Sequence, residues 1–406
     1  MLTDEKVIVI GAGPVGLVTA LGLAKLGIRV LVIEKNSEDV PSQWRGSTIH
    51  PPTLEIFDSI GLADHIMAGA IKVDVLQYRD LEIDKVVNFD YSVLENRVKF
   101  PFRLQYEQYK VLKLLRDLAS KESNIRLAYN SEIVSVRQNE ANIFIKIRNS
   151  NNETEIIGEF LVGADGSHSA VRKSLGIELD GFTYPFPTTV VATHFDFKKF
   201  IPDLAPVSYW SGPNGRLSMI KTPDIWRIAM TTPLVDVDLS TDDRGTISEP
   251  TEDFKNAIGQ LLALIPGSTL ADLELKQYEV YRSHQRIARQ FSSGRIALAG
   301  DAAHLTTTNG GMGLNSGVQD AGHLIQAIQK AVVSKSPEAL AEYSRVREEF
   351  CSKFLQPTTT LNHQTIDEQE LQIRAERLDK LQRSSESPQE VLSIVSRASM
   401  LSELVI

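Results

Sequence analysis

The chain has 406 residues, of which 42% are hydrophobic and 23% are charged, and its formal net charge at pH 7 is −9. This length and apolar content suit one large α/β unit or two domains with a sizeable core. The negative charge argues against nucleic acid or an anionic membrane as a partner, although a local basic pocket remains compatible with it. Cys351 is the single cysteine, which excludes an intrachain disulfide and a thiolate metal cluster.

The N-terminal residues predict a strand and not a targeting segment. Residues 7–10 are apolar and β-branched, and no cationic stretch leads into an apolar run before them. Apolar stretches elsewhere are shorter than the roughly 20 residues that span a bilayer. We expect a soluble, cytoplasmic protein with no membrane contact.

A glycine-rich turn follows this strand, with the sequence Gly11-Ala12-Gly13-Pro14-Val15-Gly16. Gly11 permits a tight turn, Gly13 lets the backbone approach a pyrophosphate, and Gly16 allows close packing of helix and strand. Helical spacing over 17–26 places a helix N-terminus, with free N–H groups, beside the phosphates. Glu34 closes the second strand, where a carboxylate accepts hydrogen bonds from ribose. The unit predicts an adenine dinucleotide without separating NAD from FAD.

The rest of the chain mixes helices and strands. We expect a helix over 105–120, a strand-rich block over 186–232, an exposed acidic loop over 233–253 and a mainly helical tail over 358–406. Two more apolar runs end in a carboxylate, at Asp165-Gly166 and at Gly300-Asp301. Strand ends are where a doubly wound sheet contacts its ligand.

Three motifs therefore stand in order: GAGPVG at 11–16, DGSHSAVR at 165–172, and GDAAH at 300–304 with GMGLNSG at 311–317. In this combination, residues 6–330 resemble single-component FAD-dependent aromatic monooxygenases of the p-hydroxybenzoate hydroxylase type. The resemblance implies an α/β fold: a Rossmann-like FAD-binding domain, an inserted β-sheet-rich substrate domain and a C-terminal helical segment. We expect FAD-binding segments at 1–75, 101–178 and 284–355, substrate-domain segments at 76–100 and 179–283, and C-terminal helices at 356–406.

The resemblance also names the residues that hold FAD. They are Gly11, Gly13, Pro14, Val15, Gly16, Glu34, Lys35, Arg45, Gln105, Asp165, Gly166, Asp301, Gly311, Gly313, Leu314 and Asn315. In the family the aspartate of the middle motif serves both FAD and NAD(P)H, whereas Asp165 could also simply cap the helix that starts near Ser169. Arg172 fits an ion pair or support for the FAD side better than a catalytic role.

The third motif is expected to lie along the flavin ring. Gly311 and Gly313 allow backbone N–H groups to approach a flat ring. A helix starting near Gly313 would point its positive end at the N1/C2 carbonyl region and stabilise the anionic reduced flavin by about 0.3–1 kcal/mol, or up to ~2 kcal/mol when partly buried.

No residue is assigned as catalytic, because the flavin carries the chemistry. Thr308 stands where the family commonly has proline beside the ring, so the loop's rigidity differs from the family pattern and a hydrogen bond from Thr308 becomes an option. His304 is a second candidate beside the ring, although a histidine after a strand end fits a hydrogen-bonded structural role better.

The resemblance implies that NADH or NADPH reduces FAD, that O₂ forms a C4a-hydroperoxide, and that an activated phenol or hydroxylated N-heterocycle is hydroxylated. Substrate identity and the choice between NADH and NADPH stay open. We choose five candidate substrate contacts for their residue types on the expected strands: His194, Tyr209, Met219, Lys221 and Arg227. The tail packs over the FAD domain or forms a homodimer contact in this interpretation.

Three other classes of flavoprotein are alternatives to this interpretation. A flavin-dependent halogenase lacks support because its WxWxIP signature is missing: Trp44, Trp210 and Trp226 stand alone. A flavoprotein epoxidase or saturase of a lipid or prenyl substrate is disfavoured by the absence of a membrane segment. A non-catalytic flavin-binding protein is not excluded by any residue, and NAD(P)H turnover would distinguish it.

Overall fold

The computed structural model describes residues 5–40, 46–150, 152–231, 244–245 and 252–401. Its first sheet has the order β21-β22-β12-β1-β2-β8, parallel from β22 to β8, with β21 antiparallel to β22. Every residue of β1 and β2 is buried, as expected of strands covered on both faces. The strands are β1 (Val7–Ile10), β2 (Val30–Ile33), β8 (Ile125–Ala128), β12 (Phe160–Gly163), β21 (Ser292–Ser293) and β22 (Ile296–Leu298).

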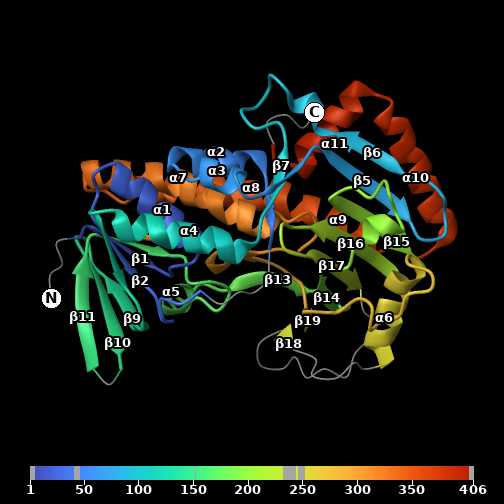
Figure 1. The fold of residues 1–406 in the computed structure, drawn as a ribbon. Helices are drawn as coiled ribbons and strands as arrows, with labels where there is room; N and C mark the ends of the chain where they lie inside the picture. The colour runs from blue at the N-terminus through green and yellow to red at the C-terminus, as the bar shows by residue number, and fades with distance from the viewer. Residues whose placement is uncertain (1–4, 41–45, 151, 232–243, 246–251, 402–406) are drawn as a thin grey trace.

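Helices cover one face of this sheet and a small antiparallel sheet packs on the other (Figure 1). The helices are α1 (Pro14–Lys25), α4 (Gln108–Lys121) and α7 (Met312–Ser334), followed by α8 (Glu338–Phe350). The small sheet consists of β9 (Glu132–Gln138), β10 (Ile143–Asn149) and β11 (Asn152–Gly158). Helices α1 and α7 approach so closely that a Cβ on Gly22 would lie 2.2 Å from Ile325 Cδ1.

A three-stranded sheet in the order β3-β7-β4 bridges toward the second half of the molecule. It consists of β3 (Thr48–Ile49), β4 (Ile71–Val73) and β7 (Arg103–Gln105), with α2 (Pro51–Ser59) and α3 (Ala63–Met67) between β3 and β4. The helix expected to start at Gln105 instead starts at Gln108. Gln105 is in a strand because its backbone pairs with Thr48 on one side and with Ile71 on the other.

The strand-rich block forms an eight-stranded sheet, β18-β19-β14-β17-β16-β15-β5-β6. Its strands are β5 (Val75–Asp80), β6 (Val87–Asp90), β14 (Thr188–Thr193), β15 (Val207–Gly212), β16 (Gly215–Lys221), β17 (Trp226–Thr231), β18 (Arg244–Gly245) and β19 (Gln277–Tyr281). All residues of β14 and β15 are buried, so this sheet is covered on both faces.

Different elements cover the two faces. One face carries Leu217, Met219, Trp226 and Ile228, which share a core with Leu261 of α6 (Glu252–Ala263). The tail covers part of the other face with α9 (Gln356–Ile366), α10 (Leu371–Ser385) and α11 (Pro388–Ala398). Helices α10 and α11 pack on β5, β6 and β15 and not over the first sheet (Figure 1). The expectation that the tail covers the FAD domain is therefore wrong for these two helices.

Short elements join the two halves. A third small sheet contains β13 (Leu179–Thr183), β20 (His284–Ala288) and β23 (His304–Leu305), and α5 (Ala170–Ser174) follows β12. Within the described residues, no helix is long and apolar enough to cross a membrane.

Candidate active site

The three sequence motifs meet at the carboxyl edge of the first sheet. Gly11 has φ +102°, and a Cβ there would lie 2.4 Å from the carbonyl oxygen of Ala164, next to the second motif. A Cβ on Gly317, in the third motif, would lie 2.7 Å from Cγ2 of Val15 and 3.1 Å from the Cα of Gly300. Backbone is therefore packed on backbone where the motifs join, as the glycines of a dinucleotide fold require.

Gly13 differs from its neighbours in facing open space. It precedes the first turn of α1, no side chain caps this end of the helix, and an added Cβ would meet nothing within 4 Å. By contrast, a Cβ on Gly16 would lie 2.0 Å from the carbonyl oxygen of Gly11. The space in front of the α1 N-terminus therefore fits a pyrophosphate, which uncapped helix N–H groups bind.

Glu34 is held against this turn. Its carboxylate accepts hydrogen bonds from Ala12 N at 2.8 Å and from the backbone N of Asn36 at 2.9 Å, and the side chain is buried. Asn36 Nδ2 donates a third hydrogen bond to this carboxylate at 2.8 Å, so the remaining lone pair suits a ribose hydroxyl. Lys35 is exposed. Arg45 lies outside the described residues.

Asp165 caps α5, as the alternative interpretation expected. Its carboxylate accepts from Ala170 N at 2.7 Å, from Val171 N at 3.1 Å and from Ser169 Oγ at 2.5 Å. Arg172 donates to the carbonyl oxygens of Ala302 and Ser167, both at 3.0 Å, and so joins the second motif to the third. Contacts of Asp165 and the partly exposed Gly166 with FAD stay predictions.

The loop before α7 is fastened to β3. Gly311 has φ +67°, and a Cβ there would lie 2.7 Å from Thr48 Cβ. Asn315 is fully buried; its amide donates to the carbonyl oxygens of Thr48 and Gly311 at 2.9 and 2.6 Å, and its Oδ1 accepts from His50 N at 2.8 Å. Gln105 accepts from Ser47 Oγ at 2.9 Å.

The side chains of Asn315 and Gln105 thus position the segment around Thr48, and their own contacts with FAD stay predictions. Gly313 and Leu314 lie partly exposed in the first turn of α7. Asp301 is exposed on the short helix at Gly300–Ala302.

His304 belongs to a buried ionic network behind the site. Asp320 accepts from His304 Nε2 at 2.7 Å, from Gly300 N at 2.9 Å and from Arg347 Nε at 2.6 Å. Burial opposes a charge on His304, but Cys351 and Asp320 hold its pKa well above the ordinary value. Burial likewise opposes ionisation of Asp320, yet His304 and Arg347 lower its pKa to about 2. This geometry favours the structural role of His304.

One face of the eight-stranded sheet meets the loop that carries Thr308. Tyr281 donates from its hydroxyl to Thr308 Oγ1 at 3.0 Å, and the same tyrosine forms an apolar cluster with Val190 and Ala229. Because side chains alternate along a strand, Arg227, which is two residues from Ala229 in the regularly paired β17, lies on this loop-facing side. Ile228 and Trp226 point into the opposite core.

The five proposed substrate contacts divide between the two faces. Tyr209 pairs with Ser218, which pairs with Ala229, so Tyr209 lies on the loop-facing side together with Arg227. Met219 is fully buried in the opposite core, a position that does not support its proposed substrate contact. Lys221 is two residues from Met219 and shares that opposite side.

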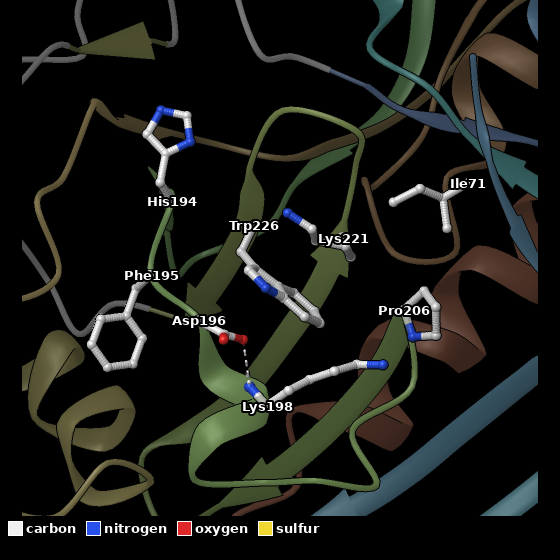
Figure 2. A pocket seen from close by; sticks show the side chains of 8 residues that line it. All are labelled: Ile71, His194, Phe195, Asp196, Lys198, Pro206, Lys221 and Trp226. Atoms are coloured by element: carbon white, nitrogen blue, oxygen red, sulfur yellow. Dashed lines mark hydrogen bonds between the residues drawn. The ribbon is translucent and has the colours of Figure 1, made fainter.

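His194 is also away from the loop. It is exposed just after β14, and its Nδ1 lies 2.9 Å from the carbonyl oxygen of Asp224. His194 and Lys221 line a separate pocket with Trp226 (Figure 2). Neither residue is brought to Thr308, so the structure does not support them as aromatic-substrate contacts in this site.

Arg103, the most unusual charge near the site, is not among the residues predicted from the sequence. Its guanidinium is 1% exposed, its Nε donates to the Tyr91 hydroxyl, and its Nη2 donates to the Ala398 carbonyl oxygen at 3.3 Å. Nη1 is buried without a hydrogen-bond partner. Burial disfavours its charge, but the phenol groups of Tyr91 and Tyr209 raise the pKa of Arg103 on balance. Among the described residues, no carboxylate forms an ion pair with Arg103.

His50 connects Arg103 to the loop. Its Nε2 lies 2.9 Å from the Gly310 carbonyl oxygen, and burial and the charge of Arg103 lower the pKa of His50 to about 3. Tyr78 lies against Tyr209, with ring centroids 5.8 Å apart. The only signal in the sequence was an arginine two residues before Gln105 in an apolar stretch.

The cradle in front of α1 and the loop that is fastened beside it define the class of protein as one that binds a dinucleotide. A family model described as an FAD binding domain matches residues 4–358, and the chain belongs to this family. Para-nitrophenol 4-monooxygenase of Pseudomonas sp. (strain WBC-3) is 31% identical over 375 residues, covering 89% of this chain and 87% of that protein.

Two further comparisons agree. The 6-hydroxy-3-succinoylpyridine 3-monooxygenase HspB of Pseudomonas putida (strain DSM 28022 / S16) is 29% identical, with 82% of this chain and 81% of that protein covered. The crystal structure of p-nitrophenol 4-monooxygenase PnpA from Pseudomonas putida DLL-E4 has a TM-score of 0.88 and 28% identity, and covers 100% of this chain and 99% of that chain. The protein is a single-component FAD-dependent aromatic hydroxylase, and the halogenase and lipid-oxidising alternatives are not favoured.

Gly13→Val should remove FAD while leaving the fold intact. The new side chain meets no protein atom near its Cβ but fills the space in front of α1, so we expect flavin absorbance to be lost and the unfolding free energy of the apoprotein to change by about 1 kcal/mol or less. Gly16→Val is the contrast: it clashes with backbone and should destabilise the apoprotein by about 3 kcal/mol or more. Full FAD affinity in Gly13→Val would contradict the assignment.

Asp320→Asn should lower the free energy of unfolding by about 3–5 kcal/mol, because it leaves His304 and Arg347 buried without a carboxylate. Urea unfolding measures the change. Asp58→Asn, which removes the exposed partner of Lys99, is the control and should cost less than about 1 kcal/mol. The lowered pKa of Asp320 stabilises the fold above about pH 4, and this contribution is lost as the pH falls toward about 2. Equal losses in the two variants would argue against the network.

Proposed function

We propose that the enzyme takes its aromatic substrate as an anion, a phenolate or the deprotonated form of a hydroxylated N-heterocycle, whose oxygen accepts a hydrogen bond from Arg103. The supporting observation is the buried guanidinium with an unpartnered Nη1 and no carboxylate partner among the described residues. A buried charge without a counter-charge is costly, and a bound anion would offset that cost. The names of both reported relatives describe aromatic substrates with a ring hydroxyl.

The residues present fit FAD, which supplies oxygen activation after reduction by NAD(P)H. In our proposal, the first turn of α1 and Gly13 hold the pyrophosphate, and Glu34 holds the adenosine ribose. The N-terminal end of α7 and the backbone at Gly311 stabilise negative charge on the ring.

Arg103 has two roles in this proposal. Its positive charge favours the deprotonated substrate, and a phenolate ring is richer in electrons than the phenol and therefore a better nucleophile. Its fixed position beside Tyr91 also orients the ring. The apolar cluster of Val190, Ala229 and Tyr281 keeps water from the reacting carbon.

We also propose the remaining assignments from the sequence. The pairing of β5 and β6 with β15 supports placing 76–100 with 179–283 in a substrate domain, with FAD-binding segments at 1–75, 101–178 and 284–355 and the tail at 356–406. A single cysteine suits a reducing cytoplasm. Exposed Leu371 and Ile373 on α10 support a homodimer contact, which light scattering would test.

Anaerobic reduction tests the function. We expect NADH or NADPH to bleach the flavin slowly alone and much faster with one member of a panel of phenols and hydroxypyridines. Methyl ethers of the same compounds are the matched control, because they cannot ionise, and they should not accelerate bleaching. Acceleration by the ethers as strong as by the phenols would contradict an anionic substrate.

Arg103→Gln should weaken binding of 4-nitrophenol by roughly 10- to 100-fold, the loss expected for one hydrogen bond to a charged group. Flavin absorbance changes on titration give the dissociation constant, and the FAD content should remain that of the parent protein. Arg103→Lys keeps the charge and should recover part of the affinity. Unchanged affinity in a folded, FAD-loaded Arg103→Gln variant would rule out the proposed contact.

A further inference from the structure

The loop before α7 has little in its own sequence to fix its backbone. Residues 306–311, which we call the α7 loop, read Thr-Thr-Thr-Asn-Gly-Gly, and Gly310 and Gly311 have φ +88° and +67°. Glycine gives the backbone more conformational freedom than other residues do, and the loop has no proline to reduce that freedom. The position of the α7 loop therefore depends on hydrogen bonds from the elements around it.

Helix α9 of the tail supplies one of these hydrogen bonds. Asn309 is buried in the α7 loop, and its Nδ2 lies 3.1 Å from Nδ1 of His363. Among the described residues, His363 is the only hydrogen-bond partner of the Asn309 side chain. One residue earlier on α9, Asn362 lies so close to the loop that a Cβ on Gly310 would be 3.0 Å from its Nδ2. The tail helix is therefore in direct contact with the α7 loop.

His363 is itself held in one orientation. Its Nε2 lies 3.2 Å from Oδ2 of Asp367, directly after α9, and the same oxygen accepts from Arg216 Nη1 at 2.8 Å. Arg216 is 1% exposed, and its Nη2 donates to Thr188 Oγ1 at 2.5 Å. The ring of Tyr184 lies against the imidazole, with ring centroids 3.8 Å apart. A carboxylate, a buried guanidinium and an aromatic ring thus fix the imidazole that contacts the loop.

The same neighbours decide which nitrogen of His363 carries the proton. Burial and the charge of Arg216 lower the pKa of His363 to about 4, although Asp367 opposes them, so the imidazole is neutral at pH 7 and has one N–H. That N–H is on Nε2, which faces the carboxylate. Nδ1 is then an acceptor, with Asn309 Nδ2 at 3.1 Å and Arg216 Nη1 at 3.2 Å as donors. Asn309 consequently turns its amide N–H groups toward the tail.

We infer that His363 positions the α7 loop against the flavin ring by holding Asn309. Backbone N–H groups of the loop and the N-terminal end of α7 stabilise negative charge on the reduced ring only while they stay beside it. Loss of the hydrogen bond frees the loop and weakens this stabilisation. His363 acts through Asn309 and is therefore a positioning residue. The inference rests on the proposed place of the ring beside this loop and not on an anionic substrate.

The midpoint potential of bound FAD, measured on the FAD-loaded protein without substrate, tests this role. His363→Ala should lower the equilibrium constant for flavin reduction roughly 3- to 10-fold, or about 15–30 mV for a two-electron couple, as expected for the loss of one hydrogen bond. His363→Gln keeps an acceptor for Asn309 and a donor for Asp367, and should retain the parent potential. Gln364→Ala, at an exposed neighbour on α9, is the matched control and should retain it too.

A double-mutant cycle separates positioning from a general effect of the tail on stability. Asn309→Ala should lower the potential as much as His363→Ala, and the double variant should lower it no further, because both changes remove the same contact. Additive shifts, or an unchanged potential in folded, FAD-loaded His363→Ala, would overturn the inference. An unchanged potential in Asn309→Ala as well would overturn the placement of the ring beside the loop. No step uses 4-nitrophenol, so failure of the phenolate proposal leaves this test readable.

Discussion

The arrangement of the active site depends on the close packing of backbone against backbone at one edge of the first sheet. A side chain at Gly11 would strike the carbonyl of Ala164, and one at Gly317 would strike Val15 and Gly300. Segments that are far apart in the sequence can therefore meet closely, with the first turns of α1 and α7 as neighbours. In the proposed assignment, the two helix N-termini hold the two ends of one dinucleotide, and Asp301 then shares a ligand with the turn at Gly11.

A second constraint is the cost of burying charge, which acts on both sides of the site. Asp320 is buried with two cationic partners and satisfies them, so that network fixes α7 and α8 behind the site. Arg103 is buried among phenol groups, forms no ion pair with a carboxylate among the described residues, and has its Nη1 without a hydrogen-bond acceptor. The charge of Asp320 is therefore structural, whereas we expect the partner of Arg103 to be the substrate.

Much of the cofactor side could be predicted because its signals are local. A strand, three glycines and Glu34 fall within one βαβ unit, and Glu34 lies against Ala12 as the pattern requires. The substrate side gives no such signal. Since β15 and most of β16 are buried on both faces, hydrophobic residues do not alternate along them, and the sequence could not show that Tyr209 and Met219 face opposite ways. The importance of Arg103 arises only from tertiary neighbours on β15 and near β6.

The most direct measurement is the ionisation of bound 4-nitrophenol, whose phenol and phenolate forms absorb at different wavelengths. The FAD-loaded protein would be titrated with the ligand across pH without nucleotide, and the pKa of bound ligand compared with that of free ligand. A positive charge at Arg103 predicts a bound pKa at least one unit lower than the free value, because the site favours the anion. A bound pKa that is unchanged or higher would show that the site prefers the neutral phenol and would contradict the account.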